Sequence, residues 1–337
     1  MTKFKILISI LCLFFVFSVQ AQEADLYQKV LMPGGPFQGQ ILNTSKLRTY
    51  VLLSDANNIL PEPLSKSYGY IANVSHNGKR YVARVRLDAP TAVNFIYEKF
   101  TNMMGGHADL VYTFNKKMPL ELIYEIRDGE SEKDFSLIRL SRPILLQHIL
   151  LTAEAVKIVG DTTPLAKGGI ENKFGMAYRM TSIPERLIGP VIVEGRKTTV
   201  FDVPFNKPKV VRSFWDTVNT QSKIGMSENY NLVSNNCITS AVRGLANGLT
   251  AAEEARVEAE LARTFLRIGA LSRQDLTDAE IKEMLSEYAK MLRGGAGGAV
   301  KSKATFTPIM ERSFFTDWLT EEQKAAIVNR SCKQIFN

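Results

Sequence analysis

Alternation of apolar and polar side chains predicts a group of β-strands in the first half of the chain. Four segments carry this pattern or a closely related apolar run: 80–87, 108–114, 120–126 and 135–140. Asp128 and Gly129, between the last two segments, form a dipeptide typical of a tight hairpin turn. We therefore predict a small, mostly antiparallel sheet that follows an irregular lead-in over residues 22–65.

Helical patterns predominate in the remainder of the chain. Residues 144–160 have the composition of a helix, whereas 189–205 contain two short strand patterns around a Glu-Gly dipeptide. Past residue 206, apolar side chains recur at helical spacing: Val210, Val211, Phe214, Trp215 and Val218. The mixture predicts an α+β fold.

Three capping boxes predict further helices towards the C-terminus. In each, a threonine is followed three residues later by Glu or Gln, so that N–H groups of the first turn find acceptors. The pairs are Thr250 with Glu253, Thr277 with Glu280, and Thr320 with Gln323. A glycine-rich stretch near 294–304 is typical of a flexible linker. We therefore divide the chain into a core domain over 66–250 and a helical extension over 251–337.

The first 21 residues have the pattern of a secretory signal peptide. Lys3 and Lys5 precede a nearly unbroken apolar run over 6–17, and small residues end the stretch at Val19 and Ala21. No later segment approaches the roughly 18 to 20 apolar residues that a membrane-spanning helix needs. We expect a mature protein without a transmembrane span that is secreted across the inner membrane, with the periplasm as its location.

The charge pattern and the motifs narrow the function classes. The chain of 337 residues has a formal net charge of +8, but its lysines and arginines form no run of five or six, which argues against nucleic acid as a partner. The sequence contains no HExxH motif, no paired Cys/His spacing and no GxSxG motif. We expect neither a metal ion nor a cofactor.

Cysteine chemistry is the main candidate that remains. Cys237 and Cys332 lie beyond the predicted signal peptide. Cys237 begins a predicted helix, with Asn235 or Asn236 as its N-cap, and the positive end of the helix dipole there favours a thiolate over the thiol. Three interpretations stay open: a nucleophile, a small buried core residue, or half of a Cys237–Cys332 disulfide, which an oxidising compartment permits.

A thiolate nucleophile needs an imidazole to exchange its proton, and the chain has three histidines. His76 stands next to a turn dipeptide and is predicted to be exposed, whereas His148 lies in an apolar segment and is predicted to be a core or helix-surface residue. His107 follows Gly106 and begins a strand, so it projects to the same side as Asp109, which could orient the ring. The sequence thus favours Cys237 with His107 as the catalytic pair.

The two segments "GGHADLVYTF" and "YNLVSNNCITSAV" resemble the Lnb N-terminal periplasmic domain family, which contains bacterial lipoprotein N-acylation transferases and their relatives. The matching positions are Gly106, His107, Tyr230, Asn231, Asn236 and Cys237. One residue, Ile238, separates Cys237 from the threonine that the family pattern has next. The resemblance implies a permuted NlpC-type papain-like core with the small antiparallel sheet and the helical C-terminal extension.

The resemblance also implies a mechanism. Cys237 would attack an ester or amide carbonyl, His107 would shuttle the proton, and the Cys237 N–H with the Tyr230 hydroxyl would meet the oxyanion, supported by Asn235 and Asn236. We expect an exported cysteine-dependent acyltransferase or hydrolase that acts through an acyl-thioester on an envelope lipid or lipoprotein. Two alternatives stay open: an NlpC-like amidase or endopeptidase acting on peptidoglycan peptide, and a non-catalytic envelope protein with a Cys237–Cys332 disulfide.

Overall fold

The computed structural model describes nine parts of the chain: residues 26, 30–54, 59–99, 106–129, 135–187, 196–203, 205–232, 235–248 and 308–311. The predicted signal peptide, the three capping boxes, the glycine-rich stretch and Cys332 lie outside the described residues. Among the helices that the structure describes, none combines the length and the apolar character that a membrane crossing requires.

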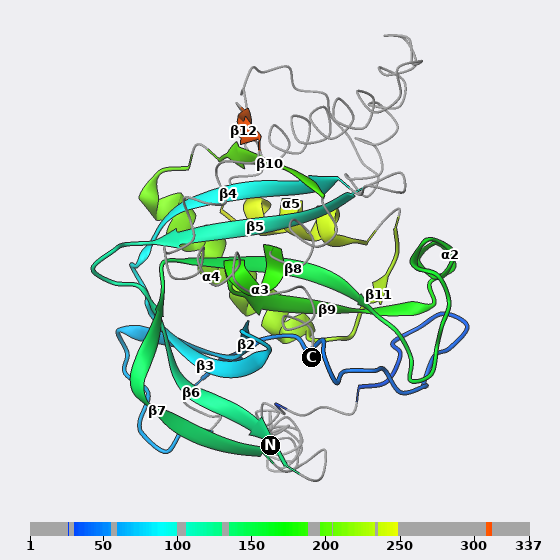
Figure 1. The fold of residues 1–337 in the computed structure, drawn as a ribbon, viewed down its shortest axis with the longest axis horizontal. Helices are drawn as coiled ribbons and strands as arrows, with labels where there is room; N and C mark the ends of the chain where they lie inside the picture. Colours follow the sequence, from blue (N-terminus) through cyan, green and yellow to red (C-terminus); the bar gives the residue numbers. More distant parts are fainter. Residues whose placement is uncertain are drawn as a thin grey trace, which may run out of the picture.

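The described strands join in one large, mostly antiparallel sheet (Figure 1). In chain order they are β1 (Val51–Leu53), β2 (Tyr68–His76), β3 (Lys79–Arg86), β4 (Pro90–Lys99), β5 (Gly106–Phe114), β6 (Leu120–Asp128), β7 (Phe135–Leu146), β8 (His148–Val156), β9 (Phe174–Thr181), β10 (Lys197–Asp202), β11 (Asn229–Tyr230) and β12 (Pro308–Glu311). The main path runs β12-β10-β4-β5-β8-β9-β2-β3-β6-β7, while β1 pairs with β2 and β11 with β9. Only the β2–β9 pair is parallel among the described strands. The prediction of a small sheet was therefore wrong in size, while the α+β class and the antiparallel character are confirmed.

Four described helices accompany the sheet: α2 (Leu165–Ile170), α3 (Ile183–Leu187), α4 (Lys207–Ile224) and α5 (Cys237–Ala246). A Cβ atom added to Gly244 of α5 would lie 2.8 Å from Leu110 of β5, whereas Arg186 of α3 contacts Asp109, the preceding residue of the same strand. Neighbouring residues of a strand point to opposite faces of the sheet. Helices α3 and α5 therefore cover opposite faces, as Figure 1 shows for β8 and β9 with α3 in front and α4 and α5 behind.

The main core lies between the sheet and helices α4 and α5. The helical stripe predicted from residue 210 onwards is real: Val210, Phe214 and Val218 are fully buried. Phe214 packs edge-on against Tyr112 and Phe114 of β5, with ring centroids 5.1 and 5.6 Å apart. Burying each such side chain stabilises the fold by about 1.5–3 kcal/mol. This packing fixes α4, and α5 beside it, on the sheet.

Several strand predictions are confirmed, and one helix prediction is wrong. The four predicted strands correspond to β3, β5, β6 and the first half of β7, and the predicted hairpin joins β6 to β7 with Asp128 opposite Phe135. Residues 144–160, predicted as a helix, form the end of β7 and all of β8. The reason is that β8 pairs with β5 and β9 and buries both its faces, so its apolar run lacks the alternation of a half-exposed strand. In the predicted helical extension, the described residues 308–311 form a strand.

Candidate functional site

The residues predicted to form a catalytic pair belong to β5 and α5, which pack together where two central strands separate. Pairing between β5 and β8 ends at Asp109 and Thr152, yet β5 continues to Gly106 and β8 to Val156. We call this divergence the fork; its arms are residues 106–109 and 152–156. Helix α5 packs against both strands, and Figure 1 shows the arms spreading apart next to its first turn.

Cys237 is the first residue of α5 and is held there by a complete cap. The Asn236 side-chain oxygen accepts hydrogen bonds from the N–H groups of Ile238 (2.9 Å) and Thr239 (3.1 Å). The Thr239 hydroxyl accepts one in return from the Asn236 N–H, at 2.8 Å. The predicted helix start is confirmed, with threonine in the place that Glu or Gln usually fills. Cys237 forms no disulfide within the described part of the chain and is only 3% exposed.

Asn235, the other predicted cap, has a different role. Its amide nitrogen donates to Glu228 (3.1 Å) and to the backbone oxygen of Asn229 (2.9 Å), and its oxygen accepts from Arg243. Backbone hydrogen bonds also tie it to Asn231 in both directions. Asn235 therefore closes the loop that leads into α5, and Asn236 alone caps the helix.

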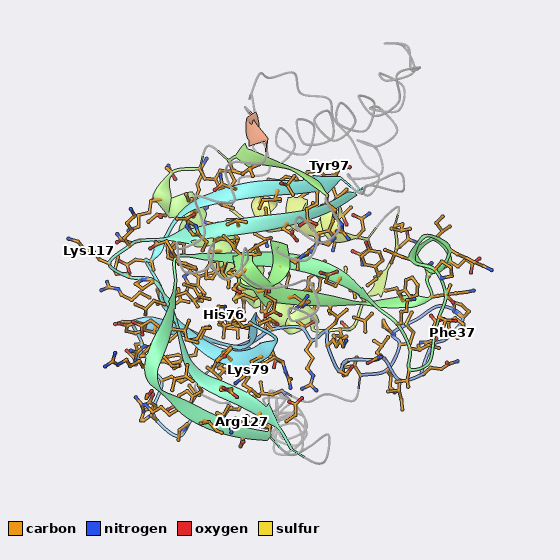
Figure 2. All side chains as sticks on the ribbon, in the orientation of Figure 1. Phe37, His76, Lys79, Tyr97, Lys117 and Arg127 are labelled. Atoms are coloured by element: carbon orange, nitrogen blue, oxygen red, sulfur yellow. The ribbon has the colours of Figure 1, made fainter. Side chains whose placement is uncertain are left out.

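Two tyrosines stand beside the thiol. The Tyr230 hydroxyl, from β11, donates towards Cys237 Sγ at 4.0 Å, a long contact even for sulfur. Burial and the negative charge of a Cys237 thiolate raise the pKa of Tyr230 far above its ordinary value. The same two causes raise the pKa of Tyr97, at the end of β4, to about 12 (Figure 2). Both tyrosine hydroxyls thus remain protonated and able to donate.

Gly106 allows one of these tyrosines to lie against the backbone. A Cβ atom at this position would come within 2.5 Å of the Tyr97 hydroxyl and of the Glu98 backbone oxygen. The absence of a side chain at Gly106 therefore permits this close approach.

His107 and Asp109 form the hydrogen-bonded pair that strand periodicity predicts. His107 Nε2 lies 2.9 Å from Asp109 Oδ1 and 2.7 Å from the Thr152 hydroxyl, and both ionisable side chains are buried. Because Nε2 is engaged by these two partners, Nδ1 is the ring nitrogen that remains for proton exchange with the thiol. Thr152 was missed because it lies in the segment predicted as a helix; as a strand residue it would have been a neighbour of Asp109.

No hydrogen bond joins His107 and Cys237 in the described structure. Strand alternation turns His107 towards the face that α3 covers, whereas α5 lies on the other face. Burial and the charge of Arg186 oppose the charged imidazole, but a negative charge on Cys237 and the Asp109 carboxylate raise the pKa of His107 well above its usual value.

A buried cluster of ion pairs surrounds this histidine. Arg186 of α3 lies 3.4 Å from Glu98 of β4, 3.7 Å from Asp109 and 3.6 Å from Glu154 of β8. Burial alone would raise the pKa of Asp109, yet Arg186 and His107 hold it well below its usual range. The pKa of Glu98 is raised by burial, against the pull of Arg186. No local sequence pattern marks these residues, since their elements meet only through the sheet and α3.

The other two histidines take no part in the site. His76 was predicted to be exposed but is buried: its Nδ1 lies 2.9 Å from the Ser182 hydroxyl, because the start of α3 covers the end of β2. His148 begins β8, with Nδ1 3.0 Å from the Thr113 hydroxyl, and burial lowers its pKa to about 4. No metal site of three or more His, Cys, Asp or Glu side chains occurs in the part of the chain that the structure describes.

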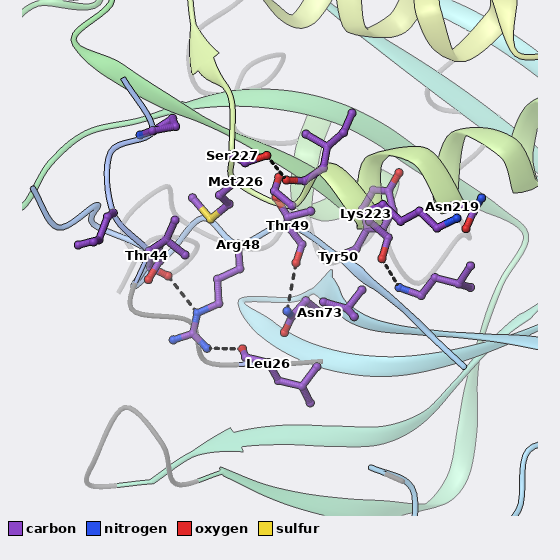
Figure 3. A pocket seen from close by; sticks show the side chains of 18 of the residues that line it. Leu26, Thr44, Arg48, Thr49, Tyr50, Asn73, Asn219, Lys223, Met226 and Ser227 are labelled. Carbon is purple, nitrogen blue, oxygen red and sulfur yellow. Dashed lines mark hydrogen bonds between the residues drawn. The ribbon is translucent and has the colours of Figure 1, made fainter. Parts of the chain in front are cut away.

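A cavity of about 940 Å³ lies elsewhere in the molecule, between the lead-in, β1 and the end of α4 (Figure 3). Arg48 crosses it and donates to the backbone oxygens of Thr44 (3.1 Å) and Leu26 (3.0 Å). None of the site residues lines this cavity.

The chain matches no protein-family model, no curated protein and no solved structure.

Proposed function

We propose that this protein is a cysteine-dependent acyltransferase or hydrolase in which Cys237 carries the acyl group as a thioester. The observation that carries the proposal is the coupling of a helix-start thiol to a buried imidazole that Asp109 and Thr152 hold in place. A nucleophile next to a base that a third group orients is the arrangement that covalent acyl transfer requires. Perturbed buried ionisable groups also concentrate at functional sites.

The chemistry follows from these positions. The Cys237 thiol passes its proton to His107, and its sulfur attacks the carbonyl carbon of an ester or amide. The Cys237 N–H and the neutral Tyr230 hydroxyl are placed to donate to the resulting oxyanion, since the cap engages the next two amides instead. Collapse of the intermediate breaks the bond to the leaving group, which takes the proton from His107. An amine or water then gives a proton to His107 and attacks the thioester carbonyl, and the C–S bond breaks to release the acyl product and the Cys237 thiolate, which recovers its proton from His107.

The substrate class comes from the resemblance to the Lnb N-terminal periplasmic domain family. A permuted papain-like core in an exported protein fits an envelope lipid or lipoprotein as the acyl donor. The helix-start cysteine packed on an antiparallel sheet that bears the histidine supports this proposal. Cleavage of peptidoglycan peptide by the same pair, or a disulfide that consumes the thiol, would appear as a different outcome of the test.

Acyl trapping tests the proposal directly. The purified protein is incubated with a short-chain p-nitrophenyl ester, and the adduct is located by mass spectrometry of its peptides. We expect an acyl group on Cys237 and none in Cys237→Ser. Adduct formation should fall by about 10²-fold or more in His107→Ala, the usual contribution of a general base. His148→Ala, which removes a histidine remote from the thiol, should behave as the wild type.

Two results would contradict the proposal. An unmodified Cys237 after prolonged incubation would exclude acyl chemistry at this thiol. A linked Cys237–Cys332 peptide, recovered without reductant, would leave a non-catalytic envelope protein. Release of acyl groups from lipoprotein and not from peptidoglycan fragments would separate the two substrate classes.

A further inference from the structure

We propose that Arg186 is a positioning residue for the reaction: its buried guanidinium keeps Asp109 ionised, and Asp109 then holds His107 in place. The inference rests on the proposed function and adds a residue that touches neither thiol nor substrate. Arg186 belongs to α3, a five-residue helix on the sheet face opposite α5. Arg186 therefore contacts Asp109 from the sheet face opposite the one on which Cys237 lies.

The contacts of Arg186 show why it matters for Asp109 in particular. Its side chain is 8% exposed and lies among carboxylates of three different strands, Glu98, Asp109 and Glu154. Two of these carboxylates have a second cation, since Arg196 lies 3.1 Å from Glu98 and Arg179 lies 3.8 Å from Glu154. Asp109, which is fully buried, has Arg186 and His107 as its ion-pair partners among the described residues, and of these two only Arg186 is charged at every pH of interest.

The contact between Arg186 and Asp109 acts through charge. Arg186 Nε and Asp109 Oδ2 lie 3.7 Å apart, and neither atom makes a hydrogen bond within the described structure. An ion pair without a hydrogen bond does not fix the orientation of the carboxylate, but in a buried site the attraction between the two charges is strong. It leaves Oδ1 for His107 while keeping the whole group negative. Without Arg186, only His107 and Thr152 would oppose the effect of burial, so the pKa of Asp109 would rise and its carboxylate would hold His107 less firmly.

The sheet holds α3 in place, so Arg186 is rigidly presented. The Ser182 N–H donates to the Ser75 backbone oxygen at 3.0 Å, and the Arg186 N–H donates back to Ser182 at 3.1 Å. Glu185 accepts from the Gly78 N–H at 3.1 Å. These bonds connect α3 to the turn between β2 and β3. The backbone that carries the Arg186 side chain is therefore held in place by hydrogen bonds to the sheet.

The test is the pH dependence of Cys237 alkylation by iodoacetamide, measured peptide by peptide from pH 5 to 9. We expect rapid labelling of the wild type at pH 6. Arg186→Met should slow labelling at pH 6 by at least about tenfold and much less at pH 9, because a charge effect shifts the profile. Arg186→Lys should restore most of the rate. Arg80→Met, which removes a half-buried arginine of β3 paired with Asp128 of β6, should leave the profile unchanged.

A second variant keeps the test decisive if Arg186→Met does not fold. Arg186→Met with Asp109→Asn removes both charges of the pair, and its profile is compared with that of Asp109→Asn alone. If Arg186 works through Asp109, the added substitution changes nothing further, whereas two independent roles would add. Additive slowing, or equal slowing at every pH, would overturn the inference.

The failure of this inference is distinguishable from failure of the proposed function. Slow labelling of the wild type at pH 6 would count against an activated thiol whatever Arg186 does. Fast labelling in the wild type and an identical profile in Arg186→Met would leave the catalytic pair intact and remove Arg186 from it.

Discussion

Ion pairs occur in two regions of the same sheet, and they differ in burial. At the fork, the side chains of Arg186, Asp109 and Glu98 are 8%, 0% and 0% exposed. On the β3–β6 ribbon, the pair of Lys79 with Glu125 has side chains 54% and 12% exposed. The chemical groups are alike, and both sets bridge neighbouring elements. What differs is whether water surrounds the charges.

This difference in burial indicates which ion pairs contribute to stability and which are better explained by the candidate site. Exposed pairs contribute about 0–1 kcal/mol, because water screens them and ordering the side chains has an entropic cost. Buried charges lose their hydration, and apolar residues of similar size often stabilise a fold as well or better. A cluster of buried charges around His107 is therefore poor evidence for stability as its purpose. It is better explained by the chemistry proposed for the adjacent thiol.

The largest predicted effect comes from removing one carboxylate of an ion pair in each region. Asp109→Asn should lower the free energy of unfolding by about 3 kcal/mol, because it leaves buried cationic groups without their counter-charge. Glu125→Gln, the matched substitution on the ribbon, should lower it by less than about 1 kcal/mol. Urea unfolding of both variants and the wild type at pH 7 gives the comparison.

Equal losses of stability in the two variants would mean that burial at the fork does not set the strength of its ion pairs. The distinction between the two regions would then have no energetic basis. Asp109→Asn should also slow acyl-adduct formation, which Glu125→Gln should leave unchanged.

The second prediction contrasts a half-buried histidine, His148, with the buried His107 through pH. Burial lowers the pKa of His148 to about 4, below the value near 6.5 of an unfolded chain. The unfolded state then binds more protons, so this histidine removes stability as the pH falls from 6.5 towards 4. Between pH 7 and 5 the loss should be about 2 kcal/mol. His148→Gln should abolish that part of the pH dependence in urea unfolding.

His107 is expected to act with the opposite sign. Its pKa is raised in the folded state, so its stabilising contribution is complete below pH 6.5 and is lost as the pH rises through the folded value. If His148→Gln lost stability between pH 7 and 5 as steeply as the wild type, burial of that ring would not explain the acid sensitivity.

Local chemistry made part of the site predictable. The helix start at Cys237 follows from a cap whose partners lie within three residues, and the shared side of His107 and Asp109 follows from strand periodicity. Four strands and the β6–β7 hairpin were predictable for the same reason, since alternation and turn residues are local signals.

The remainder depends on pairings between distant segments. Thr152 reaches His107 only because β8 is a central strand, and its doubly buried apolar run was misinterpreted as a helix. Arg186 and Glu98 enter the site from α3 and β4, and no spacing in the sequence relates them to Cys237. His76 was misjudged because a turn dipeptide indicates an exposed neighbour, while here α3 covers it.

The smallest predicted effect compares two helix starts that differ in function. Asn236 caps α5 at the thiol, and Asn206 caps α4, where its side chain accepts from the Lys209 N–H at 3.1 Å. Replacing either asparagine by alanine should lower the free energy of unfolding by about 1 kcal/mol. Only Asn236→Ala should also slow acyl-adduct formation, by about tenfold, because small displacements of a reacting group are costly to the rate.

The pair of variants separates scaffold from site. Both remove the same side chain from the same position of a helix, and urea unfolding of each variant shows how much of a rate change the loss of overall stability explains. If Asn206→Ala slowed the reaction as much as Asn236→Ala, the rate would report overall stability, and the first turn of α5 would be scaffold alone. If only Asn236→Ala does so, the cap that places Cys237 at the fork belongs to the site, although it touches neither sulfur nor imidazole.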